Sequence, residues 1–311
     1  MVNILVVGGA GYVGGGIVDK LKKNHNVTVY DSLIYEESYR KDVDFVYGDI
    51  REQKKLLPLL DKCDAVIWLA ALVGDGACAI NPELTFEINS DSVKFLAENF
   101  NKRIVFLSTC SVYGAQEGLL DESSTINPLS AYATSKVKAE DYLKDSNAII
   151  FRLGTLFGIS DEFSRIRLDL VVNILVTKAL TEGKLTVFGG DQWRPLLHVI
   201  DVANAIDHTI NLKTTGIYNL HYENFKIIDI ANAIVERIPS ASIETTPMKF
   251  QDARNYQVSS EKLFQDTGFK ASTNLLQGID EVFNLISNNR IKDVSHNRYS
   301  NQNFLEEHGV S

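Results

Sequence analysis

The N-terminal half of the chain alternates short, almost wholly apolar runs with amphipathic stretches of helical spacing. Apolar side chains on both faces of a strand indicate a sheet that is covered on both sides. The alternation therefore predicts an α/β fold with a doubly wound parallel sheet. The predicted strands are Ile4–Val7, Val27–Tyr30, Val43–Tyr47, Ala65–Leu69, Ile104–Leu107 and Ala148–Phe151.

After residue 155 this alternation becomes irregular. Residues 164–181 have the apolar spacing of one long helix, and Asp201 is placed to cap a helix that runs to Asn211. We therefore expect a smaller, mixed α/β lobe after the first domain, with a ligand between the two. The predicted parts are residues 1–160, which also receive part of the later chain, residues 161–290, and a polar, extended C-terminal arm over 291–311.

Composition argues against several classes of partner. The 311 residues carry a formal net charge of −9, which disfavours a nucleic-acid partner. The longest apolar stretch, residues 65–73, is well short of the roughly 20 residues that a membrane span needs, and the first residues lack the charged region of a signal peptide. The three cysteines have no metal-ligand spacing and suit a reducing compartment. We expect a cytoplasmic protein without a metal or a membrane partner.

A glycine-rich turn follows the first predicted strand. Gly8, Gly11 and Gly14 are three residues apart and open an amphipathic stretch. The first permits a tight turn, the second lets a diphosphate approach the backbone at a helix N-terminus, and the third lets the helix pack closely on the sheet. The turn predicts a dinucleotide-binding domain of the Rossmann type.

An acidic residue closes the second predicted strand. Asp31 stands 17 residues after Gly14, where a carboxylate accepts both ribose hydroxyls of an adenosine and repels a 2′-phosphate. No lysine or arginine lies between Asp31 and Arg40 to bind such a phosphate. The sequence therefore predicts NAD and not NADP, and the alternative is that Asp31 only caps a turn.

Tyr132 and Lys136 form a candidate catalytic pair. They are four residues apart in a predicted helix, so both lie on one face. A phenol with a pKa of about 10 is a poor base at neutral pH, but a nearby ammonium and a cationic nicotinamide both favour the phenolate. The preceding strand ends at Thr109, and open α/β sheets bind ligands at the carboxyl ends of their strands. Thr109 is thus placed to hydrogen-bond the oxygen on which Tyr132 acts.

Together these features resemble the extended short-chain dehydrogenase/reductase family, and within it the nucleotide-sugar epimerases and dehydratases. The resemblance extends over residues 1–285. The residues before the Asn81-Pro82 helix start, 72–78, also resemble members that act on bacterial capsule or lipopolysaccharide sugars, including heptoses. Further matching motifs are Gly48–Ile50, Leu69–Ala71, Asn89, Val112–Gly114, Arg152–Gly154 and Arg194–Val199 with Asp201.

The resemblance implies a role for each candidate site residue. Tyr132 is the acid/base, Lys136 holds the nicotinamide ribose, and Thr109 has the family's Ser/Thr role. The resemblance also implies thirteen cofactor-binding residues: Gly8, Gly11, Tyr12, Val13, Gly14, Asp31, Asp49, Ile50, Leu69, Ala70, Ala71, Tyr132 and Lys136. The implied substrate residues are Thr109, Ser111, Thr155, Asn173, Arg194 and Arg254.

Two arginines match those that bind the diphosphate of the substrate. Arg194 belongs to the motif over residues 194–199, and Arg254 to residues 252–256. A guanidinium makes charge-assisted hydrogen bonds that suit a diphosphate. The alternative for both is a salt bridge at the surface or between the lobes.

Departures from the family pattern narrow the reaction. Thr155 replaces an asparagine found in many members, so one substrate contact differs. Sugar 4,6-dehydratases have Asp and Glu directly after the catalytic threonine, whereas this chain has Cys110 and Ser111, so β-elimination is disfavoured. Cys110 is also one position away from the cysteine of the C3/C5 epimerases, which makes it a packed cysteine. Hydride transfer at C4 of a nucleotide-linked sugar remains, through a 4-keto species.

Several alternatives stay open at this point. The C4 chemistry fits an epimerase, a dehydrogenase or a 4-keto reductase, and less well a 4,6-dehydratase. A small alcohol or ketone substrate would not need Arg194, and a dinucleotide-sensing regulator would not need Tyr132 and Lys136. The resemblance also implies a homodimer that pairs through helices near residues 82–100 and 129–145.

Overall fold

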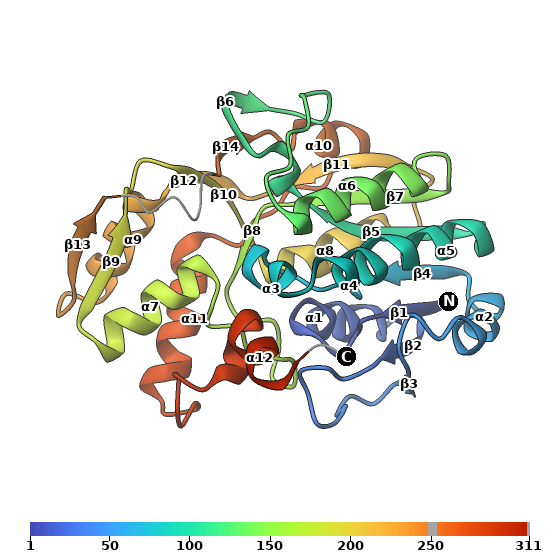
Figure 1. The fold of residues 1–311 in the computed structure, drawn as a ribbon, viewed down its shortest axis with the longest axis horizontal. Coiled ribbons are helices and arrows are strands. Elements are labelled where there is room, and N and C mark those ends of the chain that lie inside the picture. The colour runs from blue at the N-terminus through green and yellow to red at the C-terminus, as the bar shows by residue number, and fades with distance from the viewer. Residues whose placement is uncertain (248–253, 310–311) are drawn as a thin grey trace.

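The computed structural model describes residues 1–247 and 254–309. Its first domain is built on a seven-stranded sheet in the order β11-β7-β5-β4-β1-β2-β3, in which all neighbouring strands are parallel (Figure 1). This confirms the predicted doubly wound sheet. The strands are β1 (Asn3–Val7), β2 (Asn26–Asp31), β3 (Asp44–Tyr47), β4 (Ala65–Trp68), β5 (Arg103–Thr109), β7 (Ala148–Leu153) and β11 (Gly216–Leu220).

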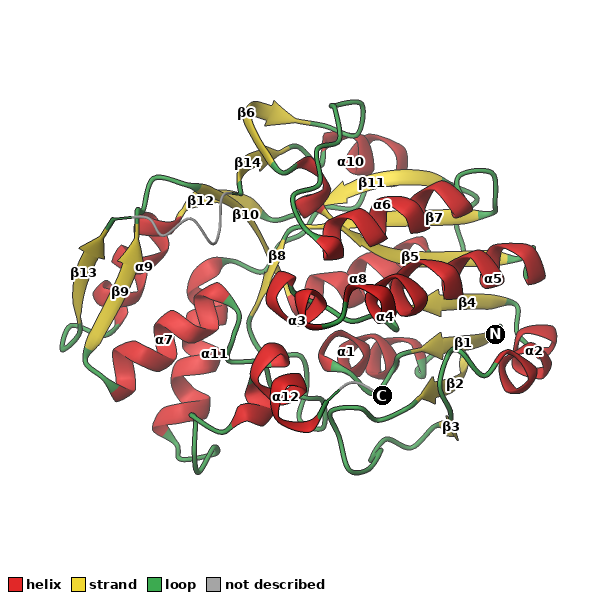
Figure 2. Ribbon diagram, in the orientation of Figure 1, coloured by secondary structure: helices red, strands yellow, loops and turns green. Residues whose placement is uncertain are grey.

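Helices cover both faces of the sheet (Figure 2), and each face has its own apolar core. One core is formed with α1 (Tyr12–Leu21), α8 (Val199–Thr209) and α10 (Glu261–Thr267). The other is formed with α2 (Gln53–Lys62), α3 (Asp75–Ile80), α4 (Pro82–Phe86), the π-helix η1 (Glu87–Asp91), α5 (Ser92–Asn99) and α6 (Ala131–Leu143). Among the described residues, no helix combines the length and apolar character needed to cross a membrane.

The second lobe lies beside the carboxyl ends of the parallel strands (Figure 1). Around a third apolar core pack α7 (Val171–Thr181), α9 (Ile227–Arg237) and α11 (Leu275–Ser287). Its strands are β8 (Thr155–Phe157), β10 (Trp193–His198) and β12 (Glu223–Lys226) in one sheet, and β9 (Lys184–Phe188) with β13 (Ser242–Thr246) in another. A last pair, β6 (Ala115–Leu120) and β14 (Asn255–Val258), joins the lobes above the 3-10 helix η2 (Cys110–Tyr113).

The predicted helix over residues 164–181 is wrong in its first part. The helix α7 begins only at Val171. The residues before it form a loop in which Arg165 and Arg167 make polar contacts: Arg165 with Asn301, and Arg167 with Asp169. Asp169 in turn accepts the N–H of Asn301 at 2.9 Å, and such contacts with a distant segment outweigh a local helical pattern.

The predicted start of α8 is also wrong. His198, and not Asp201, caps the helix, because its Nδ1 accepts the N–H of Ile200 at 3.2 Å. Asp201 lies in the first turn, where its carboxylate accepts the N–H groups of Ser272 and Thr273 at 3.0 and 2.8 Å. It therefore ties α8 to the segment that precedes α11.

The expectation of an extended C-terminal arm is wrong as well. The segment forms the 3-10 helix η3 (Asn297–Tyr299) and then α12 (Asn301–His308), which contacts α3. Asn301 and Leu305 are buried, and Leu305 belongs to the core of the first domain. Phe304 also packs against this core and lies 5.2 Å from the Tyr35 ring, so a few apolar and polar contacts fold the segment back; residues 310 and 311 lie outside the described range.

A buried ion pair joins α6 to β7. The Arg152 guanidinium donates to both carboxylate oxygens of Glu140, at 3.0 and 2.7 Å, and the two side chains are 2% and 4% exposed. Ser108 donates to the same carboxylate at 2.5 Å, and Arg152 also donates to the Tyr113 hydroxyl at 3.0 Å. The network therefore fixes α6 to the ends of β5 and β7.

We expect Arg152→Met to lower the free energy of unfolding by about 3–5 kcal/mol, because Glu140 then stays buried without a cationic partner. Urea unfolding followed by circular dichroism measures this change. The matched control is Lys94→Met, which removes the more than half-exposed Lys94–Glu98 pair at 3.8 Å and is expected to cost less than about 0.5 kcal/mol. Equal losses in the two variants would contradict the prediction.

Candidate active site

A groove crosses the carboxyl edge of the sheet, where the strand order reverses between β1 and β4. Open α/β sheets bind ligands at such a switch point. The groove is lined by eleven of the thirteen predicted cofactor residues: Gly8, Gly11, Tyr12, Val13, Gly14, Asp31, Asp49, Ile50, Leu69, Ala70 and Ala71. Tyr132 lines the cavity beside it, and Lys136 lines neither.

The glycine turn leaves room for a dinucleotide. Gly8 has φ +83°, and a Cβ there would overlap the backbone of Ala70. A Cβ on Gly14 would overlap the carbonyl of Gly9, whereas Gly11 faces open space apart from one contact at 3.6 Å. The first turn of α1 is thus open to a ligand, and its N–H groups favour an anion.

Asp31 and Asp49 line the same groove in different ways. The Asp31 carboxylate accepts the N–H of Ala10 at 2.9 Å and that of Leu33 at 2.7 Å, so it organises the turn as well as facing the groove. Burial raises the pKa of Asp31. Asp49 pairs with Arg51 at 2.7 Å, which lowers the pKa of Asp49. Its N–H donates to the Glu52 carboxylate at 2.9 Å and its carbonyl accepts the Tyr30 hydroxyl at 2.6 Å, so Asp49 organises this side of the groove.

A second cavity of about 590 Å³ adjoins the groove, within the usual size range of ligand sites. Five of the six predicted substrate residues line it together with Tyr132: Thr109, Ser111, Thr155, Arg194 and Arg254. The first two residues of the 252–256 motif lie outside the described residues.

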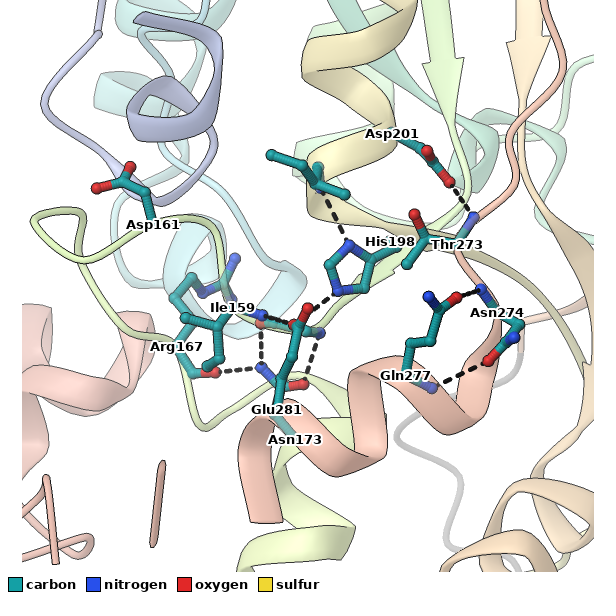
Figure 3. Close-up of polar contacts among 12 residues, drawn as sticks. Ile159, Asp161, Arg167, Asn173, His198, Asp201, Thr273, Asn274, Gln277 and Glu281 are labelled. Atoms are coloured by element: carbon teal, nitrogen blue, oxygen red, sulfur yellow. Dashed lines mark hydrogen bonds and ion pairs between the residues drawn. The ribbon is translucent and has the colours of Figure 1, made fainter. Parts of the chain in front are cut away.

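Asn173 is the predicted substrate residue that does not reach the cavity. It is 0% exposed, and its amide exchanges hydrogen bonds of 2.9 and 3.1 Å with the backbone of Gly158. Its Nδ2 also donates to the Arg167 carbonyl at 2.8 Å (Figure 3). Asn173 therefore holds the loop before α7 in place.

Tyr132 lies in the first turn of α6, which begins at a capped N-terminus. The Ser130 hydroxyl accepts the N–H of Ala133 at 3.1 Å and donates to Asp75 at 2.7 Å. The Thr109 hydroxyl hydrogen-bonds the Tyr132 phenol and lowers its pKa, but burial has the larger effect and raises it. The phenol thus needs further positive charge beside it to act as a base at neutral pH.

Lys136 lies one turn further along α6, where it is buried and lines neither the groove nor the cavity. Its Nζ donates to the Leu107 carbonyl at 2.9 Å and lies 4.8 Å from the centre of the Phe106 ring. Burial lowers the pKa of Lys136 to about 8, although Glu140 opposes this effect. The side chain therefore carries its charge at neutral pH in an almost dry site.

The three cysteines are buried and free. Cys110 is 0% exposed and its Sγ contacts the Arg152 carbonyl at 3.1 Å, which confirms its interpretation as a packed cysteine. Burial raises the pKa of the Cys78 thiol to about 12. None of these thiols is a thiolate at neutral pH.

The two predicted diphosphate arginines contact each other in the lining of the cavity. Arg194 donates to the carbonyl oxygens of Trp193 and Arg254. Arg254 forms an ion pair with Asp75 at 3.3 Å and donates to the Ser111 hydroxyl at 3.4 Å. Arg254 thus links β14 of the later chain to α3 of the first domain.

The motif around His198 supports the contact between the lobes. His198 contacts Glu281 of α11 at 2.8 Å, and Glu281 also accepts the N–H of Ile159 at 2.9 Å (Figure 3). Asn89 has a comparable role in the first domain. Its side-chain amide accepts the N–H of Leu72 at 2.8 Å and donates to the carbonyl of Leu72 at 2.9 Å. Both residues position loops that line the site.

The sequence did not predict several polar lining residues, and four of them make contacts that organise the site. Arg167 and Asn301 line both the groove and the cavity, Arg165 lines the groove, and Asp75 lines the cavity. The available signal was the pair Arg165 and Arg167, two charges inside a run with otherwise helical apolar spacing. Asn301 had no local signal, because its contacts lie more than 130 residues away.

The buried charge of Lys136 makes stability depend on pH. Its pKa is about 8 in the folded chain and about 10.4 when unfolded, so between these values the unfolded chain binds more protons and stability rises with pH. Relative to Lys136→Met, we expect the wild type to gain about 2 kcal/mol of unfolding free energy from pH 7.5 to 9.5. Urea unfolding of both proteins measures this difference, in which other titrating groups cancel. A difference that does not change with pH would exclude a lowered pKa.

Comparisons with known proteins agree with this geometry. Residues 4–221 match the NAD dependent epimerase/dehydratase family. A putative UDP-glucose 4-epimerase of Methanocaldococcus jannaschii is 30% identical, with 92% of this chain and 99% of that protein covered. The UDP-glucose 4-epimerase of Neisseria meningitidis is 26% identical, with 93% and 98% covered. The structure of the UDP-glucose 4-epimerase of Thermotoga maritima with UDP-glucose superposes with a TM-score of 0.82 at 20% identity, with 93% and 100% covered. The chain belongs to the NAD-dependent epimerase/dehydratase family, whose members compared above are nucleotide-sugar enzymes, and it is therefore an enzyme.

Proposed function

We propose that this protein inverts C4 of a nucleotide-linked sugar by oxidation to the 4-ketone and reduction from the opposite face. The observation that carries the proposal is one cavity that holds Tyr132, Thr109, Arg194 and Arg254 and shares a wall with the dinucleotide groove. The arginines suit the diphosphate of the substrate, and the Tyr132 phenol and the Thr109 hydroxyl line the same cavity, where they are placed to act on its sugar. The relatives named as UDP-glucose 4-epimerases support the same reaction.

The residues around the cavity supply proton transfer and orientation. Bound NAD provides reversible hydride acceptance, which interconverts carbinol and ketone at C4. Tyr132 takes the proton of the C4 hydroxyl as the ketone forms and returns it when the carbinol is restored. Thr109 holds the same oxygen, and the charge of Lys136 favours the phenolate form of Tyr132.

Elimination is less well supported by the same residues. Cys110 is buried away from the cavity, and Ser111 carries no charge. Among the described lining residues, the carboxylates are those of Asp75 and Asp169, which form ion pairs with Arg254 and Arg167. Neither carboxylate stands directly after Thr109, where the sugar 4,6-dehydratases that the chain resembles carry their acid/base pair, so elimination is less well supported.

We also propose that the protein is a cytoplasmic homodimer. The helices from which the resemblance implies a dimer, α4 to α5 and α6, lie side by side on one face of the sheet. Sedimentation velocity at micromolar concentration distinguishes a dimer from the 34.7 kDa monomer.

The reaction is tested with UDP- and GDP-sugars in deuterium oxide, followed by NMR and by absorbance at 340 nm. We expect inversion at C4 with no lasting NADH and no solvent deuterium at any sugar carbon, because the hydride returns to its own carbon. Tyr132→Phe is expected to lower kcat by at least about 100-fold, the range of general acid–base catalysis, with substrate affinity retained.

Other outcomes identify other reactions. Stoichiometric NADH with a 4-keto product indicates a dehydrogenase, and deuterium at C5 or C6 indicates a dehydratase. The matched control is Tyr142→Phe, which removes a phenol later in the same helix, outside the lining residues. Full turnover in Tyr132→Phe would contradict the catalytic assignment.

A further inference from the structure

The dinucleotide groove is poor in positive charge for a ligand that carries a diphosphate. Its described lining residues include the carboxylates of Asp31, Glu36 and Asp49. The cationic side chains among the same residues are Arg165 and Arg167. Both come from the loop between β8 and α7, which belongs to the second lobe and not to the glycine turn.

This loop lies directly against the first turns of α1. The Ser160 hydroxyl accepts the N–H of Gly16 at 2.9 Å, and a Cβ on Gly15 would overlap the Asp161 carboxylate. Lys41 ties the loop to the first domain by ion pairs with Asp161 at 3.0 Å and Asp19 at 2.8 Å. These contacts fix the loop against α1, and the two arginines that follow line the same groove as the glycine turn.

Arg167 has its charge balanced within the loop. Its Nε and Nη2 donate to the two oxygens of Asp169, both at 2.9 Å. Its guanidinium acts electrostatically on the phenols of Tyr12, in the first turn of α1, and Tyr132. Arg167 lines both the groove that contains the glycine turn and the cavity that contains Tyr132.

Arg165 has no such balance. It is 6% exposed, its guanidinium stacks on the Tyr35 ring at 3.8 Å, and its Nη groups donate to the side chain of Asn301 and to the Arg298 carbonyl. Its Nε is buried without a hydrogen-bond partner, and it pairs with no carboxylate of the described residues within 4.0 Å. A buried guanidinium without a carboxylate partner is costly, and since Arg165 lines the groove, an anion bound there would offset this cost.

We propose that Arg165, with Arg167 beside it, binds the diphosphate of the NAD cofactor from the side opposite the glycine turn. The C-terminal segment, residues 297–308, holds Arg165 in this position through Asn301 and the Arg298 carbonyl. Asn301 is itself fixed to both lobes, since its N–H donates to Asp169 at 2.9 Å and its Nδ2 to the Val73 carbonyl at 2.8 Å. The proposal rests on the family's use of NAD and not on the proposed sugar reaction.

The test measures binding by the full chain freed of nucleotide, in the absence of any sugar. Isothermal titration with NAD, ADP and adenosine separates the diphosphate from the nucleoside. Arg165→Met keeps the apolar stem over Tyr35 and removes the charge. We expect it to weaken NAD and ADP binding about 10- to 100-fold, the usual range for hydrogen bonds to a charged group, and adenosine binding less than twofold.

The matched control is Arg298→Met, which removes the same charge from the C-terminal segment. The Arg298 side chain is 45% exposed and pairs with Glu36 at 3.6 Å, while its carbonyl contact to Arg165 is retained. We expect less than a twofold effect on all three ligands. Arg165→Lys keeps a charge and is expected to recover part of the loss, so it also tests the proposal if Arg165→Met does not fold.

Two results would overturn the proposal. Unchanged NAD affinity in Arg165→Met excludes a contact with the diphosphate. Equal losses for NAD and adenosine indicate a role in the shape of the pocket only. Since wild-type NAD binding is measured without turnover, failure of the C4 reaction is a separate result.

Discussion

The buried ion pair between Arg152 and Glu140 determines how the reacting groups face one another. Glu140 lies one turn after Lys136 on α6, and it accepts a hydrogen bond from Ser108, the neighbour of Thr109 on β5. The helix that carries the phenol is therefore fixed to the strand that carries the threonine. A buried pair costs desolvation, and it is stabilising only while both partners stay in place. The geometry of the site thus depends on contacts just beneath it, and Glu140 also supports the charge of Lys136.

The sequence predicted the parts of this site whose signals are local. The strands of the first domain are short apolar runs, and Gly8 and Gly14 are needed for contacts with backbone close to them in space. The loop before α7 was wrongly predicted as helix, because Arg165 and Asp169 are held by Asn301, 136 and 132 residues away. A pattern read over one or two helical turns contains no information on such partners.

Polar residues were harder to assign than glycines. Asn173 was expected to bind substrate, yet its amide serves the backbone of Gly158. His198 and Asp201 belong to a motif near the substrate site, and both bind backbone or side-chain groups that join the lobes. An amide or carboxylate that hydrogen-bonds the buried backbone of a loop looks the same in the sequence as one that faces a ligand. Only the packing of two lobes distinguishes the two roles.

The groove and the cavity share Val73, Leu156, Arg167 and Asn301 in their linings. Two of these, Arg167 and Asn301, belong to one hydrogen-bond network, so the C-terminal segment lies at the boundary between groove and cavity. An epimerase regenerates the oxidised cofactor at the end of each cycle and can keep it bound, whereas a dehydrogenase must replace it in every turnover. A segment packed at this boundary is compatible with a cofactor that stays bound. Together with the absence of a carboxylate directly after Thr109, this packing agrees with the reaction proposed above.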